Sequence, residues 1–369
     1  MLKLNDINIG PKLVSLFIFT GIIPLCIAGF FSSRMAIDAL MDKSFNQLIT
    51  VQELRRSELQ NTFSYHYTSI RMIVRNPQTI KLIDALVDDQ GKFSGGALVD
   101  SEQQTNAYIQ YLKEYSKMSG YKDLIVVHAQ SRDVLLSTEG KTHRAANLLS
   151  EVFKQSGLAK AFQKVVESEK RVVEDFSSYE PSGGIQSAFY GEPVFDSQKK
   201  LIAVIVVQLP PSFLTNIIES RKGMGQTGES YIVGWSKKNK RFELKTDLRT
   251  MDGDSYVTGG VLGNLNYWED AVRSGVKGNH GTYIDSAGKK VLVAYNLLDV
   301  NGVEWYLISK IDKFEVESPV RAIIIKGVGI SSVLIILIGL AAFIMARKFT
   351  RPIIEDMKFA QAISEGNFE

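Results

Sequence analysis

Two long stretches of the chain contain no charged residue. Residues 13–31 read LVSLFIFTGIIPLCIAGFF, and residues 327–346 read GVGISSVLIILIGLAAFIMA. Each stretch is close to the roughly 20 residues with which a helix crosses the hydrocarbon layer. We therefore predict two transmembrane helices. A cleaved signal peptide is the alternative for the first stretch and a buried core helix for the second, but the first apolar run is longer than the ~7–15 residues of a signal peptide.

Positive charges at the flanks of these stretches predict how the chain is oriented. They precede the first stretch and follow the second, at Lys3, Lys12, Arg347, Lys348 and Arg351. Positive residues next to membrane spans stay in the cytoplasm. We therefore expect residues 1–12 and the C-terminal end to be cytoplasmic, and the nearly 300 residues between the spans to be exported.

The segment after the first span has the apolar periodicity of a long helix. Apolar side chains recur at steps of three or four residues, or at multiples of these, at Ile37, Met41, Leu48, Val51, Leu59, Phe63 and Ile70. Such a stripe predicts a helix packed along one side, and Pro77 marks its end. A stalk that pairs with a second copy explains the length; a helix packed only on its own domain is the alternative. A loop at 88–100 and a second helix at about 102–118 complete residues 32–119.

The pattern then changes to short β-strands. We predict the order strand, strand, helix, strand, strand, strand, at 123–129, 133–138, 156–168, 171–176, 185–196 and 201–209. The same order returns further along, at 229–234, 241–247, 267–275, 281–288, 290–298 and 303–312. We therefore expect an α+β fold in which two antiparallel-sheet modules, at 120–210 and 229–313, follow one another.

A glycine-rich loop lies between the two predicted modules. A short helix at about 213–220 leads to RKGMGQTGESYIVG, where Gly223, Gly225 and Gly228 have the spacing G-x-G-x-x-G. In dinucleotide-binding folds this spacing follows a strand and opens a helix, whereas here it follows a helix and leads into a strand. We therefore interpret residues 211–228 as a linker helix and a glycine hinge, in which positive φ angles let the backbone turn sharply.

The C-terminal end has a further helical pattern. An exit helix at 314–326 leads into the second span, and RKFTRPIIEDMKFAQAISEGNFE follows it. One face of this last segment is apolar, at Ile353, Met357, Ala360 and Ile363. Arg351–Pro352 stands where the helix is expected to begin, and Gly366 where it is expected to end. The second span and residues 347–369 are thus predicted to be helical.

Composition excludes several classes of function. The net charge of +3 indicates no nucleic-acid partner. Cys26, the single cysteine, lies in the first span, so the exported segment folds without disulfides. The histidines are scattered, without the spacing of a metal site, at His66, His128, His143 and His280. With no activated nucleophile or phosphate loop, we expect no metal, no cofactor and no catalytic residue in this chain.

Several motifs in fixed order resemble a known family. GYKDLIVVHAQSRDVLLST, NLLSEVFKQSGLAKAF and DFSSYEPSGGIQSAFYGEPVFD are similar to the membrane-distal module of the double-Cache sensors of bacterial receptors, and GMGQTGESYIVG and GTYIDSAGKKVLVAYNLLDVNGVEWYLISKID to the membrane-proximal module. RPIIEDMKFAQAISEGNFE resembles the first helix of a HAMP signal relay, with Pro352, Glu355 and Gly366 at the expected places. The resemblance implies two PAS-like modules on the stalk, flanked by the two membrane helices.

The resemblance also implies a site for a small ligand in the distal module. Carried over residue by residue, the lining comprises Asp175, Phe176, Tyr179, Ser182, Gln186, Phe189 and Gln208. Amino-acid-binding relatives use an Arg-x-Trp pair for the carboxylate and an Asp on the last distal strand for the amine. This chain has no Arg-x-Trp, and Gln208 stands at the strand position. Because a neutral amide lacks the charge-assisted contact that an ammonium favours, we expect a ligand other than a typical α-amino acid.

The function implied by the resemblance is that of a homodimeric chemoreceptor in the bacterial inner membrane. A ligand bound outside the cytoplasm is expected to act through the second span and the relay helix on cytoplasmic signalling proteins, by an output module beyond Glu369. The sensory front end of a histidine kinase or nucleotide cyclase is the alternative, because the output module decides between them. A transport or adhesion binding protein is disfavoured by the relay helix.

Overall fold

The protein contains two compact units, which are described separately. The computed structural model describes residues 9–87, 103–140, 146–220, 222–236, 239–251, 253–261 and 276–364. The sheet unit comprises Phe45–Lys313, and the helical unit comprises the described parts of Met1–Ser44 and Phe314–Glu369.

Two long helices supply the helical unit. Helix α1 covers Ile9–Val74 and continues into the sheet unit, and helix α7 covers Lys313–Ser364. Both contain windows long and apolar enough to cross a membrane. The first predicted span and the stalk therefore form one uninterrupted helix, as do the exit helix, the second span and the start of the last segment.

The expected start of a separate helix at Arg351–Pro352 is wrong, because Pro352 lies inside α7. A proline fixes its own φ near the helical value and removes one backbone donor, so a long helix can continue through it. Glu355 lies on the same helix. Gly366, the predicted end of the relay helix, lies outside the described residues.

The distal module contains a five-stranded antiparallel sheet. Its strands are β1 Asp123–His128, β2 Val134–Ser137, β3 Val172–Tyr179, β4 Ile185–Phe195 and β5 Leu201–Leu209, in the order β2-β1-β5-β4-β3. Helix α4, Gly157–Ser168, follows β2. Ser156 caps this helix by accepting a hydrogen bond from the Ala159 N–H.

The proximal module repeats this topology. Its strands are β6 Glu229–Ser236, β7 Arg241–Leu244, β8 Gly278–Ile284, β9 Lys290–Val300 and β10 Val303–Asp312, in the order β7-β6-β10-β9-β8. The two strand orders correspond position by position, which confirms two antiparallel modules in tandem. The helix predicted at 267–275 lies outside the described residues.

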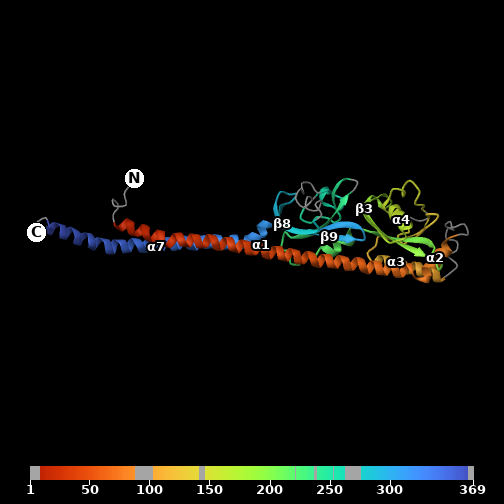
Figure 1. Ribbon diagram of the computed structural model, residues 1–369, viewed down its shortest axis with the longest axis horizontal. Helices are drawn as coiled ribbons and strands as arrows, with labels where there is room; N and C mark the ends of the chain where they lie inside the picture. Colours follow the sequence, from red (N-terminus) through yellow and green to blue (C-terminus); the bar gives the residue numbers. More distant parts are fainter. Residues whose placement is uncertain are drawn as a thin grey trace. The chain divides into compact units, whose positions relative to one another are not determined.

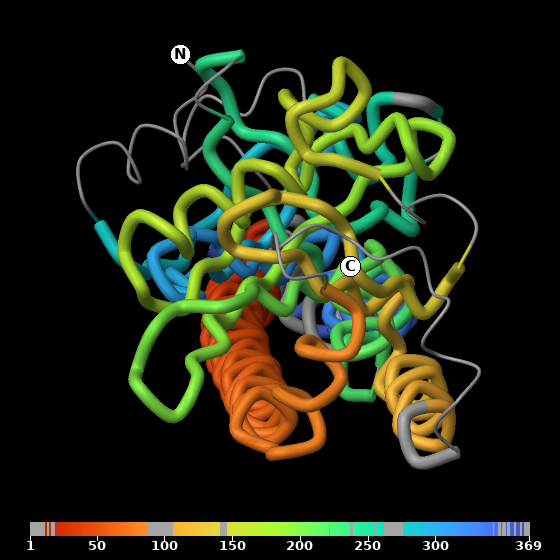
Figure 2. The backbone as a smooth tube through the Cα atoms, turned by 90° about the vertical axis from the view of Figure 1, so that its right-hand side faces the viewer, coloured from red at the N-terminus to blue at the C-terminus, as the bar shows by residue number. Residues whose placement is uncertain are grey.

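Helices cover the two faces of the distal sheet differently (Figure 1). Helix α1 lies on one face with α2, Pro77–Leu86, and α3, Gln103–Met118, while α4 covers the other. Figure 2 shows α1, in red to orange, and α3, in gold, on the same side of the sheets. Leu59, Phe63 and Ile70 of the predicted stripe are buried in the core on this side. Helix α2 was not predicted; Asn76 caps it and Pro77 occupies its first turn.

The linker between the modules contains α5, Ser212–Ile218, and the glycine loop. Gly223 and Gly225 have φ angles of +82° and +67°, which glycine adopts without steric cost. Gly228 differs from the prediction, because its φ is not positive. It is a site of close packing, where an added Cβ would meet the Met224 carbonyl oxygen at 1.8 Å.

Candidate ligand-binding site

Four of the seven predicted lining residues lie together on the α4 face of the distal sheet. Gln208 on β5 pairs across the sheet with Phe189 on β4, and directly opposed residues share a face. Tyr179, at the end of β3, contacts Phe189 with ring centroids 4.9 Å apart. Ser182 belongs to the short 3-10 turn Glu180–Ser182 that follows. We call Tyr179, Ser182, Ser187, Phe189 and Gln208 the α4-face cluster.

Gln208 is the centre of this cluster. Its side-chain nitrogen donates to the Ser187 hydroxyl at 2.8 Å and to the Ser182 hydroxyl at 3.2 Å. Its carbonyl oxygen, Oε1, is buried and has no hydrogen-bond partner in the described part of the chain. The residue is only 1% exposed. A buried acceptor without a donor costs about 1–3 kcal/mol, so the cluster is complete only when something donates a hydrogen bond to Oε1.

The aromatic members form an apolar wall beside the amide. Phe189 is fully buried and packs so closely on the start of α4 that a Cβ at Gly157 would meet its ring at 2.7 Å. Tyr179 is also fully buried. Burial, with a smaller contribution from the charges of Asp123 and Glu139, raises the pKa of the Tyr179 hydroxyl. Tyr179 therefore stays neutral and can donate or accept a hydrogen bond.

A buried carboxylate on the same face was missed by the sequence analysis. Asp123 opens β1 directly opposite Gln208 and is fully buried. It accepts hydrogen bonds from the Ser137 hydroxyl at 2.5 Å, the Thr138 hydroxyl at 2.8 Å and the Glu139 N–H at 3.0 Å. The signal in the sequence was a single acidic residue at the start of the apolar run DLIVV.

Asp175 and Phe176 point away from the α4-face cluster and lie at the junction between the modules. Asp175 forms an ion pair with Lys245, which directly follows β7, with an Nζ–Oδ2 distance of 2.9 Å. The indole N–H of Trp305 donates to Asp175 Oδ1 at 2.9 Å. The Phe176 ring packs against the Trp305 ring, with their centroids 5.9 Å apart. Phe63 of α1 packs against the same indole, with a centroid distance of 6.1 Å. These residues join the stalk, the distal module and the proximal module.

Gln186 also contacts the proximal module. It lies near the start of β4, and its side-chain amide packs against the backbone of Gly259, where an added Cβ would meet Nε2 at 2.6 Å. Gly259 has a positive φ of +87°. Of the predicted lining, the structure therefore brings together Tyr179, Ser182, Phe189 and Gln208, and it places Asp175, Phe176 and Gln186 at the module junction.

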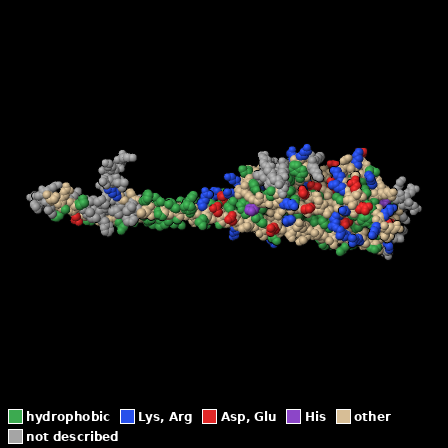
Figure 3. All heavy atoms as spheres, viewed as in Figure 1, with side chains coloured by type: hydrophobic (Ala, Val, Ile, Leu, Met, Phe, Trp, Pro, Cys, Tyr) green, Lys and Arg blue, Asp and Glu red, His purple; other side chains and the backbone are tan. Residues whose placement is uncertain are grey.

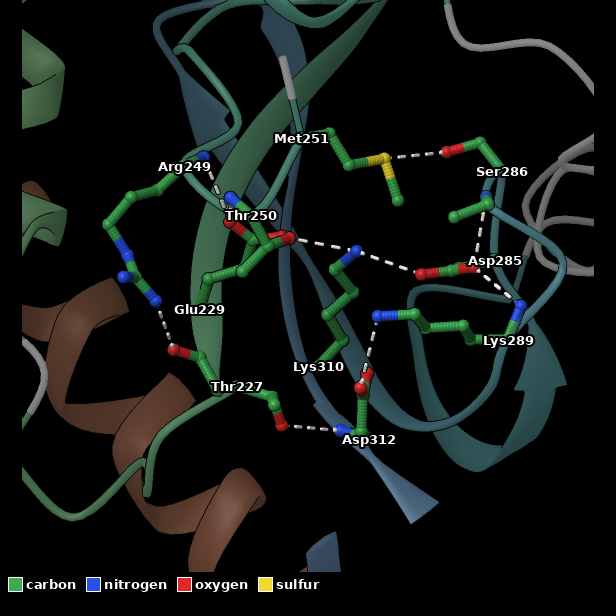
Figure 4. Close-up of polar contacts among 12 residues, drawn as sticks. Thr227, Glu229, Arg249, Thr250, Met251, Asp285, Ser286, Lys289, Lys310 and Asp312 are labelled. Carbon is green, nitrogen blue, oxygen red and sulfur yellow. Dashed lines mark hydrogen bonds and ion pairs between the residues drawn. The ribbon is translucent and has the colours of Figure 1, made fainter. Parts of the chain in front are cut away.

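The proximal module contains a buried charged cluster of its own (Figure 4). Lys310 lies between two carboxylates, with its Nζ at 3.1 Å from Glu229 Oε1 and 3.2 Å from Asp285 Oδ2. Glu229 Oε2 also accepts hydrogen bonds from the backbone N–H groups of Arg249 and Thr250, at 2.9 Å and 3.0 Å. The ammonium and both carboxylates are thus well paired, and the cluster joins β6, β10 and the turn after β8.

No group of His, Cys, Asp and Glu side chains suited to a metal ion occurs within the described residues. His128, which sits at the end of β1, contacts the Ser131 hydroxyl at 3.0 Å. Burial lowers the pKa of His128, so this histidine is a neutral, hydrogen-bonded part of the strand end.

One solved structure shares the fold of this chain, and two others are similar to it at lower scores. The extracellular domain of vpHK1S-Z8, assigned as a histidine kinase, aligns with a TM-score of 0.52 at 10% identity, over 78% of this chain and 96% of that chain. The periplasmic sensory domain of the Campylobacter jejuni chemoreceptor Tlp1 has a TM-score of 0.49 at 12% identity, over 76% and 99%. An extracellular ligand binding receptor from Desulfohalobium retbaense has a TM-score of 0.45 at 14% identity; this chain covers 40% of its length, with 72% of this chain aligned.

No curated protein matches the chain. The model of the Cache domain named dCache_1 matches residues 33–320. This match includes both sheets, the linker and most of the stalk. Cache domains of this kind are extracytoplasmic modules that bind ligands and have no enzymatic activity. With its two antiparallel sheets of identical order on one long helix, the chain belongs to the Cache domain family and contains a ligand-sensing, extracytoplasmic double-Cache region.

Proposed function

We propose that this chain is the sensory part of a chemoreceptor of the bacterial inner membrane, which binds a small ligand at the α4-face cluster. The observation that carries this proposal is the buried Oε1 of Gln208, which lacks a donor in the described part of the chain. A ligand that presents an N–H or O–H group to this oxygen offsets the cost of burying it. Tyr179 and Phe189 supply the apolar wall, and Ser182 and Ser187 hold the amide in position.

The chemistry of the cluster narrows the class of ligand. An amide oxygen accepts a hydrogen bond from a neutral or a charged donor but does not supply the charge-assisted contact that favours an ammonium. The chain also lacks the Arg-x-Trp pair expected for an α-carboxylate. We therefore expect a small polar molecule with a neutral hydroxyl or amide donor to bind more tightly than a typical α-amino acid.

The proposal is tested by a ligand screen on the complete chain in lipid nanodiscs. Thermal-shift screening against organic acids, amines, polyols and amino acids identifies a binder, and calorimetry measures its affinity. Gln208→Leu removes the acceptor and is expected to weaken binding at least about tenfold, the equivalent of one buried hydrogen bond. Gln198→Leu, in the exposed turn between β4 and β5, is the matched control and should bind normally. A binder whose affinity is the same in both variants would contradict the proposed site.

Transmission of the signal is proposed to run through the junction and α7. Asp175, Phe176 and Gln186 connect the distal module to Lys245, Trp305 and Gly259 of the proximal module, whose last strand leads into α7 without a break. A ligand changes the equilibrium between two states only by its different affinity for them, and packed helices shift by about 1–2 Å in such transitions. Gly223 and Gly225 are the proposed hinge, and Pro352, Glu355 and Gly366 belong to the proposed HAMP relay that acts on cytoplasmic signalling proteins.

Insertions in α7 test this path. One residue inserted after Arg321 rotates everything beyond it by about 100°, whereas seven residues restore nearly the original phase. In a receptor that carries an output module after residue 369, we expect the single insertion to abolish the ligand response and the seven-residue insertion to restore part of it. Equal responses from both would exclude a mechanical link through α7.

A further inference from the structure

A cavity lies on the face of the distal sheet opposite the α4-face cluster. It has a volume of about 660 Å³ and is lined by the end of α1, the start of α2, the segment before β3, β4 and the β9–β10 turn. Glu192 of β4 marks the face, because it stands between Tyr190 and Val194, which are both buried in the core beneath α1. The volume is within the roughly 300–1,000 Å³ of small-molecule sites.

The lining of this cavity is rich in positive charge. Four cationic side chains and two carboxylates line it, which leaves a net charge of +2: Arg71, Arg75, Lys170, Arg171, Glu169 and Glu192. Figure 3 shows Lys and Arg side chains gathered on the surface around β3. The positive groups come from two directions, since Arg71 lies in the last turn of α1 and Arg75 directly follows the end of that helix, while Lys170 and Arg171 precede β3.

The only buried carboxylate in this lining is Glu192, and it is shared by two guanidinium groups. Arg71 Nε lies 3.5 Å from Glu192 Oε1, and Arg171 Nε lies 3.9 Å from Oε2. The Tyr190 hydroxyl also donates a hydrogen bond to Oε2. Both arginines approach through Nε alone, so in the described part of the chain their terminal nitrogens have no hydrogen-bond acceptor. Two guanidinium groups, each able to donate two parallel hydrogen bonds to a carboxylate or phosphate, are thus held next to one cavity.

Other side-chain hydrogen-bond donors at this cavity also lack acceptors among the described residues. Arg75 and Lys170 form no ion pair with any described residue, and both are exposed to the cavity mouth. Tyr67, one turn before Arg71 on α1, lies under the Arg171 guanidinium at 5.5 Å and against the Tyr190 ring at 4.8 Å. Its hydroxyl is buried without a hydrogen-bond partner among the described residues. The cluster therefore has more donors than acceptors.

We propose that this cavity is a second ligand site, which takes a small dianion such as a dicarboxylate or a phosphate. The dianion neutralises the excess charge and supplies the missing acceptors to Arg71, Arg75, Lys170 and Arg171. It bridges the end of α1 to the distal sheet. The side chain of Asn301, in the β9–β10 turn, donates a hydrogen bond to the Arg171 carbonyl oxygen at 3.2 Å. The ligand therefore binds next to a contact between the distal and the proximal module. The site is independent of Gln208.

The experiment is calorimetry on the complete chain in nanodiscs of zwitterionic lipid, with inorganic phosphate and succinate titrated separately. Binding of at least one of the two dianions is expected, and the one that binds distinguishes a phosphate site from a dicarboxylate site. Arg75→Gln and Lys170→Gln, which remove exposed charges that pair with no described residue, should each weaken binding about tenfold. Arg241→Gln and Lys160→Gln, at exposed positions elsewhere, are the matched controls and should bind normally.

A further variant separates this site from the α4-face cluster. Gln208→Leu should leave dianion binding unchanged, whatever it does to the ligand found by screening. No heat of binding with either dianion, or equal affinities in the Arg75→Gln, Lys170→Gln and control variants, would overturn the second site. Loss of dianion binding in Gln208→Leu would also overturn it, because the anion would then occupy the first site.

Discussion

Lys245 shows how a single residue can join the two modules. Its side chain is only 2% exposed and pairs with Asp175, whose side chain is 29% exposed. A buried ammonium is stable only with its partner, and removal of one partner of a buried pair typically costs about 3–5 kcal/mol. Because Asp175 is partly solvated and keeps its hydrogen bond from Trp305, the expected cost of losing Lys245 is smaller.

We predict that Lys245→Met lowers the free energy of unfolding by about 2 kcal/mol. Lys289→Met is the control, since Lys289 is 64% exposed and pairs with Asp312 at 3.6 Å; exposed pairs contribute at most about 1 kcal/mol. Denaturant unfolding followed by circular dichroism measures both variants. Equal losses in the two would mean that the junction ion pair contributes no more than a surface pair.

His66 introduces a pH dependence at the stalk. Its ring contacts the Tyr121 hydroxyl at 2.6 Å, and burial lowers the pKa of His66 below the 6.5 of an exposed histidine. At pH values between 6.5, the pKa of His66 in the unfolded chain, and its lower pKa in the folded chain, His66 binds more protons in the unfolded chain than in the folded chain. Stability therefore falls as the pH drops below about 6.5 and is fully present above it.

Replacement of His66 should make the sheet unit less sensitive to mild acid. His66→Gln retains a polar group beside Tyr121 but does not titrate, so the fall in melting temperature from pH 7 to pH 5 should be smaller than in the original chain. His280→Gln, at an exposed position, should leave the fall unchanged. If both variants lose stability with pH as the original does, His66 is not the group responsible.

The residues that the sequence predicted as one ligand lining lie in two places in the structure. The resemblance predicted one lining that includes Tyr179, Phe189, Gln208 and Phe176, whereas the structure places the first three on the α4 face and Phe176 at the module junction. The physical reason is a register shift between Glu174 and Ser177 in the pairing of β3 with β4. The extra residue of a bulge reverses which side chains of the strand face each side of the sheet from that point on. The alternation of apolar and polar residues in the sequence does not reveal where such a bulge lies.

At the scale of elements, α1 has apolar side chains on two opposite faces. The predicted stripe is confirmed where Leu48, Leu59, Phe63 and Ile70 are buried. On the opposite face Leu54, Tyr65 and Met72 are each roughly two-thirds exposed. Their spacings of 11 and 7 residues correspond to about three and two helical turns, so they form a second line. A second copy of the chain is the partner that the stalk prediction assigns to this line.

Cysteine cross-linking tests this pairing, and the chain suits it because Cys26 is the single cysteine. In a Cys26→Ser background, Tyr65→Cys and Met72→Cys should form disulfide-linked dimers under mild oxidation in membranes. Gln60→Cys, which is exposed but about 140° around the helix from Tyr65, should not. Equal yields at all three positions would indicate random collision rather than a paired stalk.

Element-level prediction was most successful where the pattern was long or strongly periodic. The strands of both sheets, α3, α4 and α5 lie within a few residues of their predicted positions. Helix α2 was missed because Pro77 was interpreted only as the end of a helix, whereas proline also fits the first turn of the next one. The exit helix leads into the second span as expected. The continuity of α1 across the end of the first span, and of α7 through Pro352, was not predicted, because a change from apolar to amphipathic composition and a proline both resemble a boundary although the backbone continues.

At the scale of the whole chain, the two modules share a topology without obvious similarity in sequence. The order of strands and helix along the chain was sufficient to predict two sheets in tandem, but the pairing β2-β1-β5-β4-β3 and its repeat depend on long-range contacts that a single sequence does not show. The difference between the polar groups buried in the two modules is likewise visible only in the structure. The distal module has an amide oxygen, Oε1 of Gln208, without a hydrogen-bond partner among the described residues, whereas the charged cluster of the proximal module is well paired.

The sensor assignment depends on the placement of the distal module outside the cytoplasm, and a labelling experiment in intact cells tests this most directly. In a Cys26→Ser background, Ser197→Cys lies in the exposed turn between β4 and β5, and Ser364→Cys lies at the end of α7. A membrane-impermeant maleimide should label Ser197→Cys in intact cells and Ser364→Cys only after permeabilisation. Labelling of Ser364→Cys with protection of Ser197→Cys would place the double-Cache region inside the cell and contradict the account.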